Sequence, residues 1–461
     1  MNPLFNPVFL GRILKWYLQD PERLRRMNDE ELRKFQNHAF KTMLAYADTV
    51  PVYHKKYKAA GIHLSDVRGV EDIKKLPPVT KEELRSNFPT NVVPTSFQTE
   101  QAIVAATSGT TGRSLTLFTD LSAVIRSMLG FRRALLEHHI NWQHARMSLL
   151  LDLSEHSFEN EYFIHGILSV AHRIIPTKHL QILDIQRSPS DLIQEINQFE
   201  PEVILGYPFV LIQLASLKTR GCGEKIKPKV IGTSGAVIDT YSRRLVEDAF
   251  HTRVFDIYAA TESGIIAFEC EEGRYHVCSD LVFLECLTDG DDAPAGTPGV
   301  VTLTRLYGKG TPLIRYQGID DVVTVGLNDC CCGFPGDVLK AIHGRRSESI
   351  VLPDGTIALI SVFESCIGES LHEIQVNKIK RIQIVQHNID TIDVRVLFDE
   401  DLRNAGRSAE ETLSLLHHKL MERLGTQLAI HLTEVNRFDE KAPYILSTIS
   451  RTRVFEKGFL V

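Results

Sequence analysis

Residues 101–284 constrain the fold most, because short apolar runs alternate there with amphipathic stretches. The apolar runs have the length of strands, and the amphipathic stretches have the spacing of helices. We expect strands at residues 147–153, 203–206, 230–234 and 254–258, and helices at residues 190–199, 209–218 and 241–250. Such alternation is typical of an α/β sheet with helices on its faces. The segment therefore predicts an α/β fold.

The N-terminal region predicts several helices ahead of this sheet. Helices are expected between residues 20 and 60, where Asn28 can cap the first one and residues 51–54 interrupt the pattern. Another helix is expected after an extended link at residues 76–80, with Thr80 as the N-cap and Glu83 at the capping-box position.

The C-terminal region predicts a second domain, because 461 residues are too many for one ordinary core. After residues 291–299 the pattern changes to short strands, which indicates a β subdomain near residues 285–343. A hinge is expected at residues 344–347, and beyond it strands at 381–386, 392–397 and 430–434 surround a helix near 408–424. We expect a large N-terminal domain of mixed sheets flanked by helices at residues 1–343, and a small mobile α+β lid domain at residues 344–461.

The composition excludes several classes of protein. The 52 basic and 58 acidic residues are interleaved and give a formal net charge of −6, which argues against general nucleic-acid binding. No stretch approaches the roughly 18 apolar residues of a membrane span, and the first residues lack the pattern of a signal peptide. Eight cysteines are too few for a disulfide scaffold in a chain of this length and fit thiols in a reducing compartment. We expect a cytoplasmic protein with no nucleic-acid and no membrane partner.

Residues 106–113 alternate glycines with small hydroxyl residues, which suits a loop around a polyanion. Glycine lets the backbone approach a ligand closely, and hydroxyl groups can donate to phosphate oxygens. The loop is expected between two strands at a sheet edge, and it is not of the Walker type because no Gly-Lys-Ser/Thr follows. From these residues alone, a polar hairpin is an equal alternative.

Further segments fall at the expected carboxyl ends of strands, where ligands of α/β sheets bind. They are residues 206–207, 234–236 and 259–262. Glu262 has a carboxylate suited to Mg²⁺, and Tyr258 has a ring that can stack on a base. Residues 311–321 place two acids after an apolar strand, where a carboxylate can accept from ribose hydroxyls. Taken singly, each segment also fits an ordinary core or turn.

The order of these segments resembles the adenylate-forming superfamily of acyl-CoA synthetases, adenylation domains and luciferases. Residues 107–112 are similar to its phosphate loop and residues 258–262 to its Tyr-Gly-x-Thr-Glu segment. Residues 315–320 are similar to its Arg-Tyr-x-x-Gly-Asp segment, and residues 344–345 to its hinge. Within the superfamily, the chain most resembles the phenylacetate-coenzyme A ligases and their capsular-polysaccharide-associated and deazaflavin-adenylating relatives. This closer resemblance is carried by residues 50–53, 76–84 and 381–386.

The resemblance implies an ATP-dependent ligase that activates a carboxylic acid, expected to be aromatic, as an acyl-adenylate with release of pyrophosphate. Coenzyme A is the expected acceptor, reached after the lid rotates. Some members of the superfamily transfer the acyl group to an amine or adenylate a hydroxyl. A nucleotide-binding protein without adenylation activity is an alternative of another class, and a homodimer is left open.

The resemblance also implies which residues form the site. The β- and γ-phosphates would lie on residues 108–111, the adenine on residues 234–236 and Tyr258, and the ribose on Asp320. Glu262 would hold Mg²⁺, and Arg345 would meet the ribose or a phosphate. The residues implied to bind ATP are Thr107, Ser108, Gly109, Thr110, Thr111, Gly112, Ser234, Gly235, Ala236, Tyr258, Ala259, Thr261, Asp320 and Arg345.

Three positions depart from the superfamily pattern. Arg113 stands where most members have lysine after the phosphate loop, and Gln317 replaces a second arginine. The adenylation-step lysine of the C-terminal domain aligns best with Arg451. Arginine keeps the positive charge but offers a planar fork of donors in place of a compact point charge. We therefore expect Arg113 and Arg451, together with Glu262, to carry the chemistry.

Cys270, His276, Cys330 and Cys332 form a candidate zinc site, because two short ligand pairs from distant segments suit a structural ion. From the spacing alone, buried free cysteines are the better interpretation. The resemblance to the phenylacetate-ligase branch, which carries a similar Cys/His arrangement with a Cys-x-Cys-Gly, here completed by Gly333, favours zinc. Cys278 and Cys331 are alternative ligands.

Overall fold

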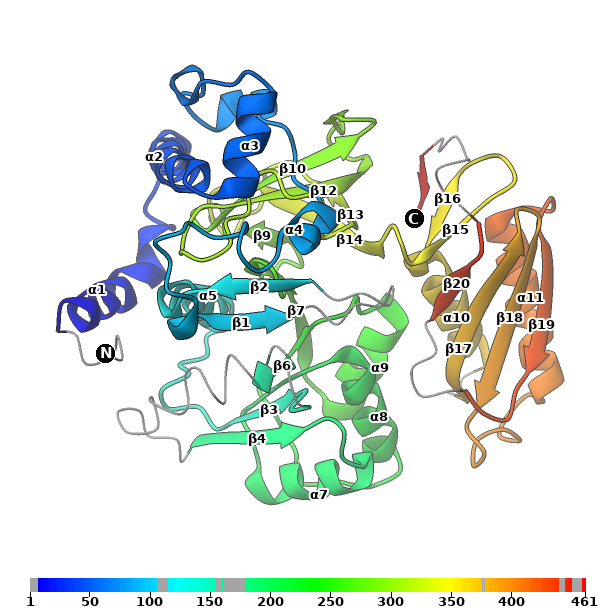
Figure 1. Cartoon of the computed structure of the whole chain (residues 1–461). Coiled ribbons are helices and arrows are strands. Elements are labelled where there is room, and N and C mark those ends of the chain that lie inside the picture. Colours follow the sequence, from blue (N-terminus) through cyan, green and yellow to red (C-terminus); the bar gives the residue numbers. More distant parts are fainter. Residues whose placement is uncertain are drawn as a thin grey trace.

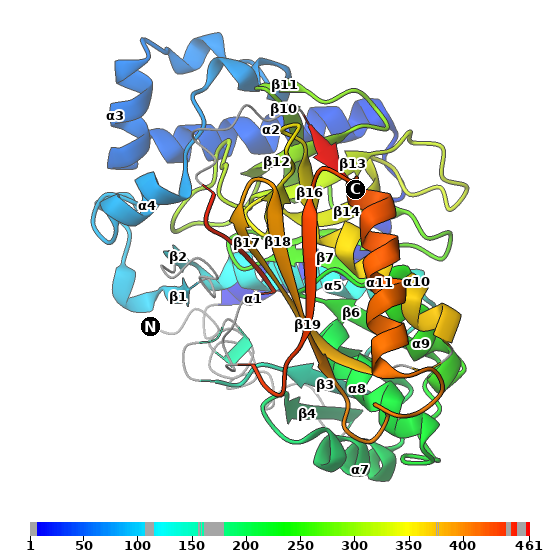
Figure 2. The same ribbon diagram turned by 90° about the vertical axis from the view of Figure 1, so that its right-hand side faces the viewer.

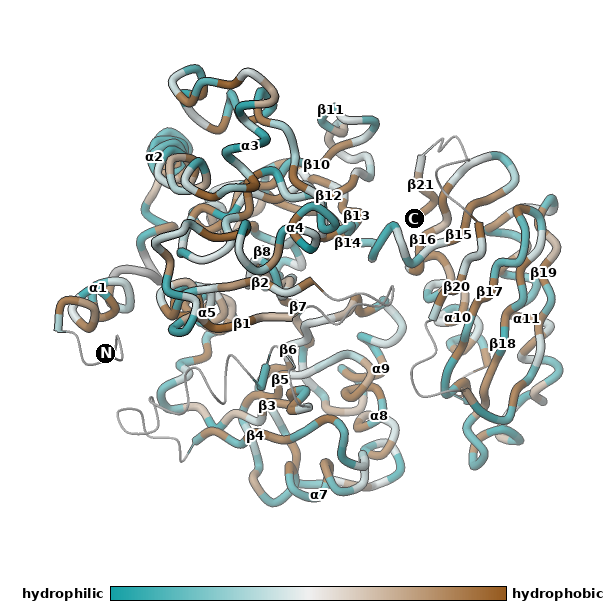
Figure 3. The backbone as a smooth tube through the Cα atoms, in the orientation of Figure 1, coloured by the Kyte–Doolittle hydropathy of each residue, from teal (hydrophilic) through white to brown (hydrophobic). Residues whose placement is uncertain are grey.

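The computed structural model describes residues 7–106, 115–154, 157, 159–160, 179–374, 376, 378–438, 444–449 and 458–461. Figure 1 shows a large N-terminal part and a smaller C-terminal part, joined after β14. Each part has its own cluster of buried apolar side chains. Figure 3 shows apolar residues along the strands inside both parts and polar residues on the connecting turns. Among the described residues, no helix has the length and apolar content needed to cross a membrane.

The chain begins with helices that pack beside the sheet. They are α1 (Pro7–Arg23), α2 (Asp29–Asp48), α3 (Pro51–Ala59) and α4 (Lys81–Asn87), with short 3₁₀ turns at Leu64–Asp66, Val70–Lys75 and Thr99–Gln101. The capping boxes expected at Asn28 with Glu31 and at Thr80 with Glu83 are both formed. Residues 51–54, expected to interrupt the helical pattern, begin a new helix, because Pro51 is the first residue of α3. Proline suits that position, since its missing N–H would have had no partner in the helix.

A two-stranded hairpin and a long helix follow. Strands β1 (Ile103–Ala106) and β2 (Thr116–Thr119) pair antiparallel, with Ala106 opposite Thr116. Asp120 then caps α5 (Leu121–Glu137) by accepting from the N–H of Ala123. The glycine- and hydroxyl-rich segment, residues 107–113, connects the two strands and lies outside the described residues.

The central sheet has twelve strands in the order β11-β10-β12-β13-β14-β9-β8-β7-β6-β5-β3-β4. Its parallel half confirms the expected alternation of strands with helices. That half comprises β3 (Met147–Leu151), β4 (Leu180–Asp184), α7 (Pro189–Phe199), β5 (Val203–Gly206), α8 (Pro208–Thr219), β6 (Val230–Ser234), α9 (Thr240–Phe250) and β7 (Arg253–Ala260). Helices α7, α8 and α9 cover the strands through a buried cluster that includes Ile196, Leu211 and Val246.

The other half of the sheet is antiparallel. It comprises β8 (Gly264–Glu269), β9 (Tyr275–Val277), β10 (Val282–Thr288), β11 (Asp291–Asp292), β12 (Pro298–Arg305), β13 (Asp321–Val325) and β14 (Val338–Arg345). The strands expected to form a separate β subdomain are hydrogen-bonded into this same sheet, because β14 pairs with β9 and β9 pairs with β8.

The C-terminal part is an α+β unit. It contains β15 (Ser349–Val351), β16 (Ile357–Leu359), α10 (Ile360–Ile374), β17 (Ile379–Asn388), β18 (Thr391–Phe398), α11 (Ala409–Leu424), β19 (Ala429–Glu434), β20 (Ile445–Ser447) and β21 (Phe459–Leu460). The four-stranded sheet β19-β18-β17-β20 packs against α10 and α11 through Ile382, Cys366 and Leu416 (Figure 2).

The two parts touch at helix α10 and at the end of α8. Gly368 of α10 packs against Tyr241 of α9 so closely that a Cβ on Gly368 would lie 2.4 Å from the Cβ of Tyr241. Arg220, which follows α8, donates to Asp399 at 3.2 Å and to Asp401 at 3.3 Å. A close helix contact and a charged contact therefore hold the C-terminal part in this orientation.

A buried ion pair ties the N-terminal helices to the sheet. Arg133 of α5 donates to both carboxylate oxygens of Asp280, at 2.7 and 2.8 Å, and Arg23 at the end of α1 also donates to Asp280. Burial alone would raise the pKa of Asp280, but the charges of the two arginines outweigh burial and hold it well below its usual range. The group is therefore a fully charged carboxylate inside the protein.

Replacing Asp280 with alanine should destabilise the protein by about 3 to 5 kcal/mol, because it leaves a buried arginine without its counter-charge. The difference is measurable as a fall in the temperature of thermal unfolding. Glu195→Ala is the matched control, since Glu195 pairs with Arg187 at the surface, and such pairs contribute roughly 1 kcal/mol or less. Equal losses in the two variants would contradict the importance of the buried pair.

Candidate active site and metal centre

The carboxyl ends of three neighbouring parallel strands meet at one edge of the sheet. Strands β5, β6 and β7 are adjacent, with Gly206 opposite Thr233 and Ser234 opposite Ile257. Parallel strands point the same way, so the segments that follow them emerge side by side. The sheet therefore brings residues 207, 234–236 and 258–262 together, as the sequence predicted (Figure 1).

The turn after β6 is tightly built. Ser234 Oγ donates to the carbonyl oxygen of Ile257 at 2.8 Å, which joins the ends of β6 and β7. Gly235 has φ +86°, and a Cβ there would lie 2.4 Å from Cε1 of Tyr207. Only glycine fits both the backbone conformation and the neighbouring ring. Gly235 and Ala236 are exposed at this turn, so a ligand can reach their backbone.

Tyr258 links the end of β7 to the start of β13. The ring is buried, and its hydroxyl donates to Oδ2 of Asp321 at 2.7 Å. Burial raises the pKa of Asp321 to about 6, although the hydrogen bond from Tyr258 and the charge of Arg345 oppose the shift. Arg345 Nε lies 4.0 Å from Oδ1 of the same carboxylate.

Asp320, expected to face a ribose, lies beside the backbone of residues 346–347. Its Oδ2 accepts from the N–H of Ser347 at 2.7 Å, and its carbonyl oxygen accepts from the N–H of Arg346 at 2.8 Å. Asp320 adopts φ +64° and Gly344 φ +92°, so each member of the pair formed by Asp321 and Arg345 follows a residue of positive φ. In this structure the Asp320 carboxylate holds the backbone at Ser347.

Glu262 is a buried residue of the turn that follows β7. Tyr316 donates its hydroxyl to Oε1 of Glu262 at 3.1 Å, and Lys81 Nζ lies 3.6 Å from the same oxygen. Lys81 comes from the distant helix α4, which a bridge between Val79 and Tyr316 holds in place. Ala259 and Thr261, on either side of Ala260, are half-buried.

Two of these side chains were missed by sequence reasoning. Lys81 and Tyr316 belong to segments that carried the resemblance, yet neither was given a role. The capping box at Thr80 was the available signal, because it fixes the first residue of α4. Arg315, in the same segment as Tyr316, instead pairs with Glu285 at 2.8 and 3.0 Å.

Several expected site residues lie outside the described residues. They are Thr107, Ser108, Gly109, Thr110, Thr111, Gly112, Arg113 and Arg451. Of the expected site, the structure thus brings together the β6 turn, the end of β7 and the end of β14.

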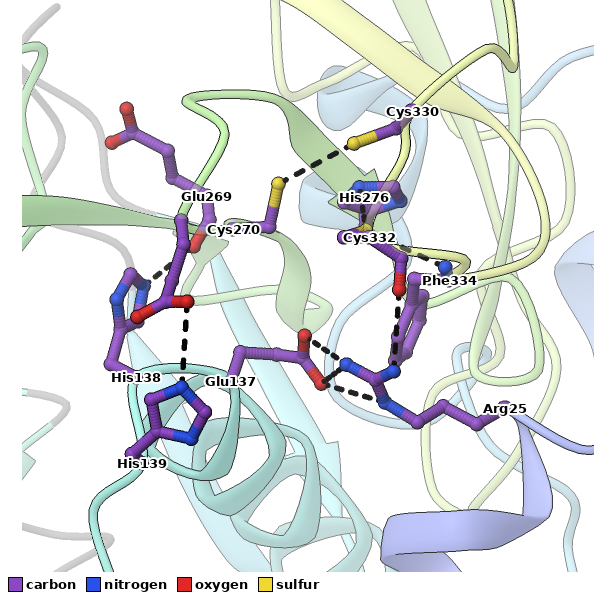
Figure 4. Close-up of polar contacts among 11 residues, drawn as sticks. Arg25, Glu137, His138, His139, Glu269, Cys270, His276, Cys330, Cys332 and Phe334 are labelled. Atoms are coloured by element: carbon purple, nitrogen blue, oxygen red, sulfur yellow. Dashed lines mark hydrogen bonds and ion pairs between the residues drawn. The ribbon is translucent and has the colours of Figure 1, made fainter.

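Cys270, His276, Cys330 and Cys332 converge, with their ligand atoms all within 4.8 Å of one another. Cys270 Sγ lies 3.7 Å from Cys330 Sγ, and Cys332 Sγ lies 3.1 Å from His276 Nε2 (Figure 4). Cys270 follows β8, His276 lies on β9, and the other two precede β14, so pairing of β9 with β14 assembles the cluster. Cys278 and Cys331, the alternative ligands, are not members of it.

A backbone N–H and an arginine side chain lie beside the cluster. The N–H of Phe334 donates to Cys332 Sγ at 3.5 Å, and Arg25 donates to the carbonyl oxygen of Cys332 at 3.3 Å (Figure 4). Arg25 is itself fixed by Glu137 of α5. Three sulfurs and one imidazole nitrogen are a common donor set for tetrahedral zinc.

The chain is similar to enzymes that activate acids. It is 25% identical over 346 residues to a phenylacetate-coenzyme A ligase of Thermus thermophilus, and the match covers 70% of this chain and 72% of the relative. It is 26% identical to the phenylacetate-coenzyme A ligase of Escherichia coli K12, covering 86% and 89% of the two chains. It is 23% identical to protein CapK of Staphylococcus aureus, covering 92% and 90%. No protein-family model matches the chain.

The fold is also similar to that of a solved ligase. A 2-hydroxyisobutyryl-CoA ligase in the postadenylation state aligns with a TM-score of 0.74 and 19% identity, covering 94% of this chain and 92% of that chain. The expected α/β fold and the resemblance to phenylacetate-coenzyme A ligases are thus confirmed.

The raised pKa of Asp321 predicts a pH-dependent stability. The folded protein binds the Asp321 proton up to about pH 6, whereas the unfolded chain releases it near pH 4. Stability should therefore fall as pH rises from about 4 to about 7, by roughly 2 to 3 kcal/mol for this group. Asp321→Asn should gain stability relative to the wild type over that range.

The comparison is made on thermal unfolding temperatures measured at several pH values. Asp390→Asn replaces an exposed side chain and should parallel the wild type throughout. If the difference in unfolding temperature between Asp321→Asn and the wild type stayed constant with pH, it would contradict the raised pKa of Asp321.

Proposed function

We propose that this chain is an ATP-dependent acid-CoA ligase. It joins a carboxylic acid to AMP with release of pyrophosphate and then transfers the acyl group to coenzyme A. The observation that carries the proposal is the meeting of Ser234, Tyr258, Glu262 and Arg345 at one edge of the sheet, beside the junction of the two parts. The phenylacetate-coenzyme A ligases to which the chain is similar support the same reaction.

In the first half-reaction, the acid carboxylate attacks the α-phosphorus of ATP and pyrophosphate leaves. The protein's task is mainly to position the reactants and to stabilise negative charge. We assign the adenine to residues 234–236 and Tyr258, the ribose to Asp320 and Arg345, and the phosphates to residues 107–112. Arg113 and Arg451 would supply positive charge to the phosphates and the carboxylate.

Glu262 fits the part of a Mg²⁺ ligand. Magnesium in nucleotide sites is held by one or two carboxylates together with phosphate oxygens, and it neutralises phosphate charge. The Glu262 carboxylate is buried at the strand-end edge, where Tyr316 and Lys81 fix its orientation. Ala259 and Thr261 belong to the segment at the end of β7 that leads to Glu262.

In the second half-reaction, coenzyme A replaces AMP on the acyl group. We propose that residues 344–461 move as a lid between the two half-reactions, turning at residues 344–347. The Arg220 contacts with Asp399 and Asp401 are weak, exposed ion pairs that such a rotation can break. We further propose an aromatic acid as substrate and the cytoplasm as the compartment, where ATP is supplied and thiols stay reduced.

We propose that Cys270, His276, Cys330 and Cys332 bind a structural zinc ion. The donor set and its convergence support this assignment. Four protein ligands leave no open coordination position, so the ion would stabilise the β8, β9 and β14 region and take no part in the reaction.

Exchange of labelled pyrophosphate into ATP tests the proposed adenylation. Over a panel of aryl and alkyl acids, at least one acid should support exchange. Glu262→Gln should slow it about 100- to 1,000-fold, because a positioned charge at the reacting phosphates is lost. Arg451→Ala should slow it strongly as well, whereas Glu195→Gln at the surface should not. Tight ATP binding with no exchange for any acid would refute the proposal.

Metal analysis of the purified protein tests the zinc site. About one zinc per chain is expected, and the Cys330→Ser, Cys332→Ser double variant should lose it and unfold at a lower temperature, since structural zinc contributes on the order of 10 kcal/mol in small domains. Cys222→Ser, which removes an exposed thiol outside the cluster, should keep its zinc. Undiminished zinc in the double variant would remove the assignment.

A further inference from the structure

A tyrosine and a glutamate form a close pair farther along the same sheet edge. Tyr207 directly follows β5, and its hydroxyl donates to Oε1 of Glu159. The Tyr207 ring lies against Gly235, in the turn assigned to adenine. Tyr207 therefore spans the space between the proposed nucleotide residues and Glu159.

The local structure fixes where this pair lies. Gly206 packs directly on Leu150, since a Cβ there would lie 2.8 Å from the Cβ of Leu150, so the ends of β5 and β3 come close together. After β3 the chain turns back, because Ser157 Oγ donates to the carbonyl oxygen of Asp152 at 2.6 Å and accepts from the N–H of Asn160 at 3.1 Å. This turn carries Glu159 toward Tyr207.

Glu159 is a desolvated carboxyl group. Burial raises its pKa, the nearby Asp152 raises it further, and the hydrogen bond from Tyr207 opposes the shift. A buried carboxyl group is costly unless hydrogen-bond donors satisfy it. A ligand that lies against Glu159 is therefore favoured if it brings a donor and disfavoured if it brings only apolar surface.

The spacing of the strands suits an acid that extends from the nucleotide to this pair. The edge runs in the order β7, β6, β5, β3, and neighbouring strands lie about 4.8 Å apart. From the end of β7, which carries Tyr258 and leads to Glu262, the distance to β5 is thus about 10 Å and to β3 about 14 Å. An acid whose remote polar group lies about 10 Å from its carboxyl group would therefore reach Tyr207 and Glu159 along this edge.

We propose that Glu159, oriented by Tyr207, determines specificity for acids that carry a hydrogen-bond donor, a hydroxyl or an amino group, at the end remote from the reacting carboxyl group. This inference rests on the proposed ligase function and narrows its substrate class. A site built to bond a donor rejects the analogue that lacks it, because its own polar group is then left unpaired. Acids with a methyl group at that end are discriminated against.

The test compares rates of ATP–pyrophosphate exchange for matched aryl acids with a hydroxyl, an amino or a methyl group at the remote position. The wild type should use the hydroxyl or the amino acid with a kcat/KM at least tenfold above that of the methyl acid. Glu159→Leu should lower kcat/KM for the donor-bearing acids at least tenfold and leave or raise it for the methyl acid. Tyr207→Phe should shift the preference in the same direction by a smaller factor.

Controls separate recognition from folding. Glu195→Leu, on the exposed face of α7, should leave the kcat/KM ratios between the acids unchanged. If Glu159→Leu does not fold, Glu159→Gln takes its place, because glutamine preserves the volume of the side chain. A wild-type preference for the methyl acid, or an equal loss for all acids in the Glu159 variants, would overturn this inference and leave the ligase function standing. Absence of exchange with every acid would overturn both.

Discussion

The hydrogen bond between Tyr258 and Asp321 is the contact on which the site depends. It joins the end of β7 to the start of β13, and so it connects the parallel half of the sheet to the strands that lead to the C-terminal part. Arg345 lies beside the same carboxylate, and the neighbouring Asp320 holds the backbone of residues 346–347. A group bound at the end of β7 therefore lies beside contacts that extend to the junction with the C-terminal part.

Two other features keep this edge in place. The Arg133–Asp280 pair fastens α5 beneath the sheet, and the cysteine–histidine cluster holds β8, β9 and the segment before β14 together. Both features stabilise the framework that carries the loops. The loops that follow β6 and β7 are held by hydrogen bonds, such as those of Tyr258 with Asp321 and of Tyr316 with Glu262, and by the contact of Gly235 with Tyr207. This division is common in α/β enzymes, where a rigid sheet positions functional loops.

Local patterns in the sequence predicted most of the elements. The capping residues Asn28 and Thr80, and the alternation from β3 to β7, depend on near neighbours in the chain and can be read directly. The four residues Cys270, His276, Cys330 and Cys332 were a candidate cluster because they form two short pairs, but the spacing alone favoured buried free cysteines, and only the resemblance to the phenylacetate-ligase branch favoured a metal site. The contacts of Lys81 with Glu262 and of Tyr207 with Glu159 join residues distant in sequence, and only the packed sheet reveals them. Between the adjacent acids Asp320 and Asp321, the register of β13 decides which one is buried against Tyr258.

A crystal structure of the protein with an accepted acid and ATP tests the central claim most directly. The account predicts a nucleotide across the ends of β6 and β7, with its adenine at residues 234–236, its phosphates toward Glu262, and the acid extending past Tyr207. A nucleotide bound elsewhere on the chain, or an acid running away from β5, would contradict it.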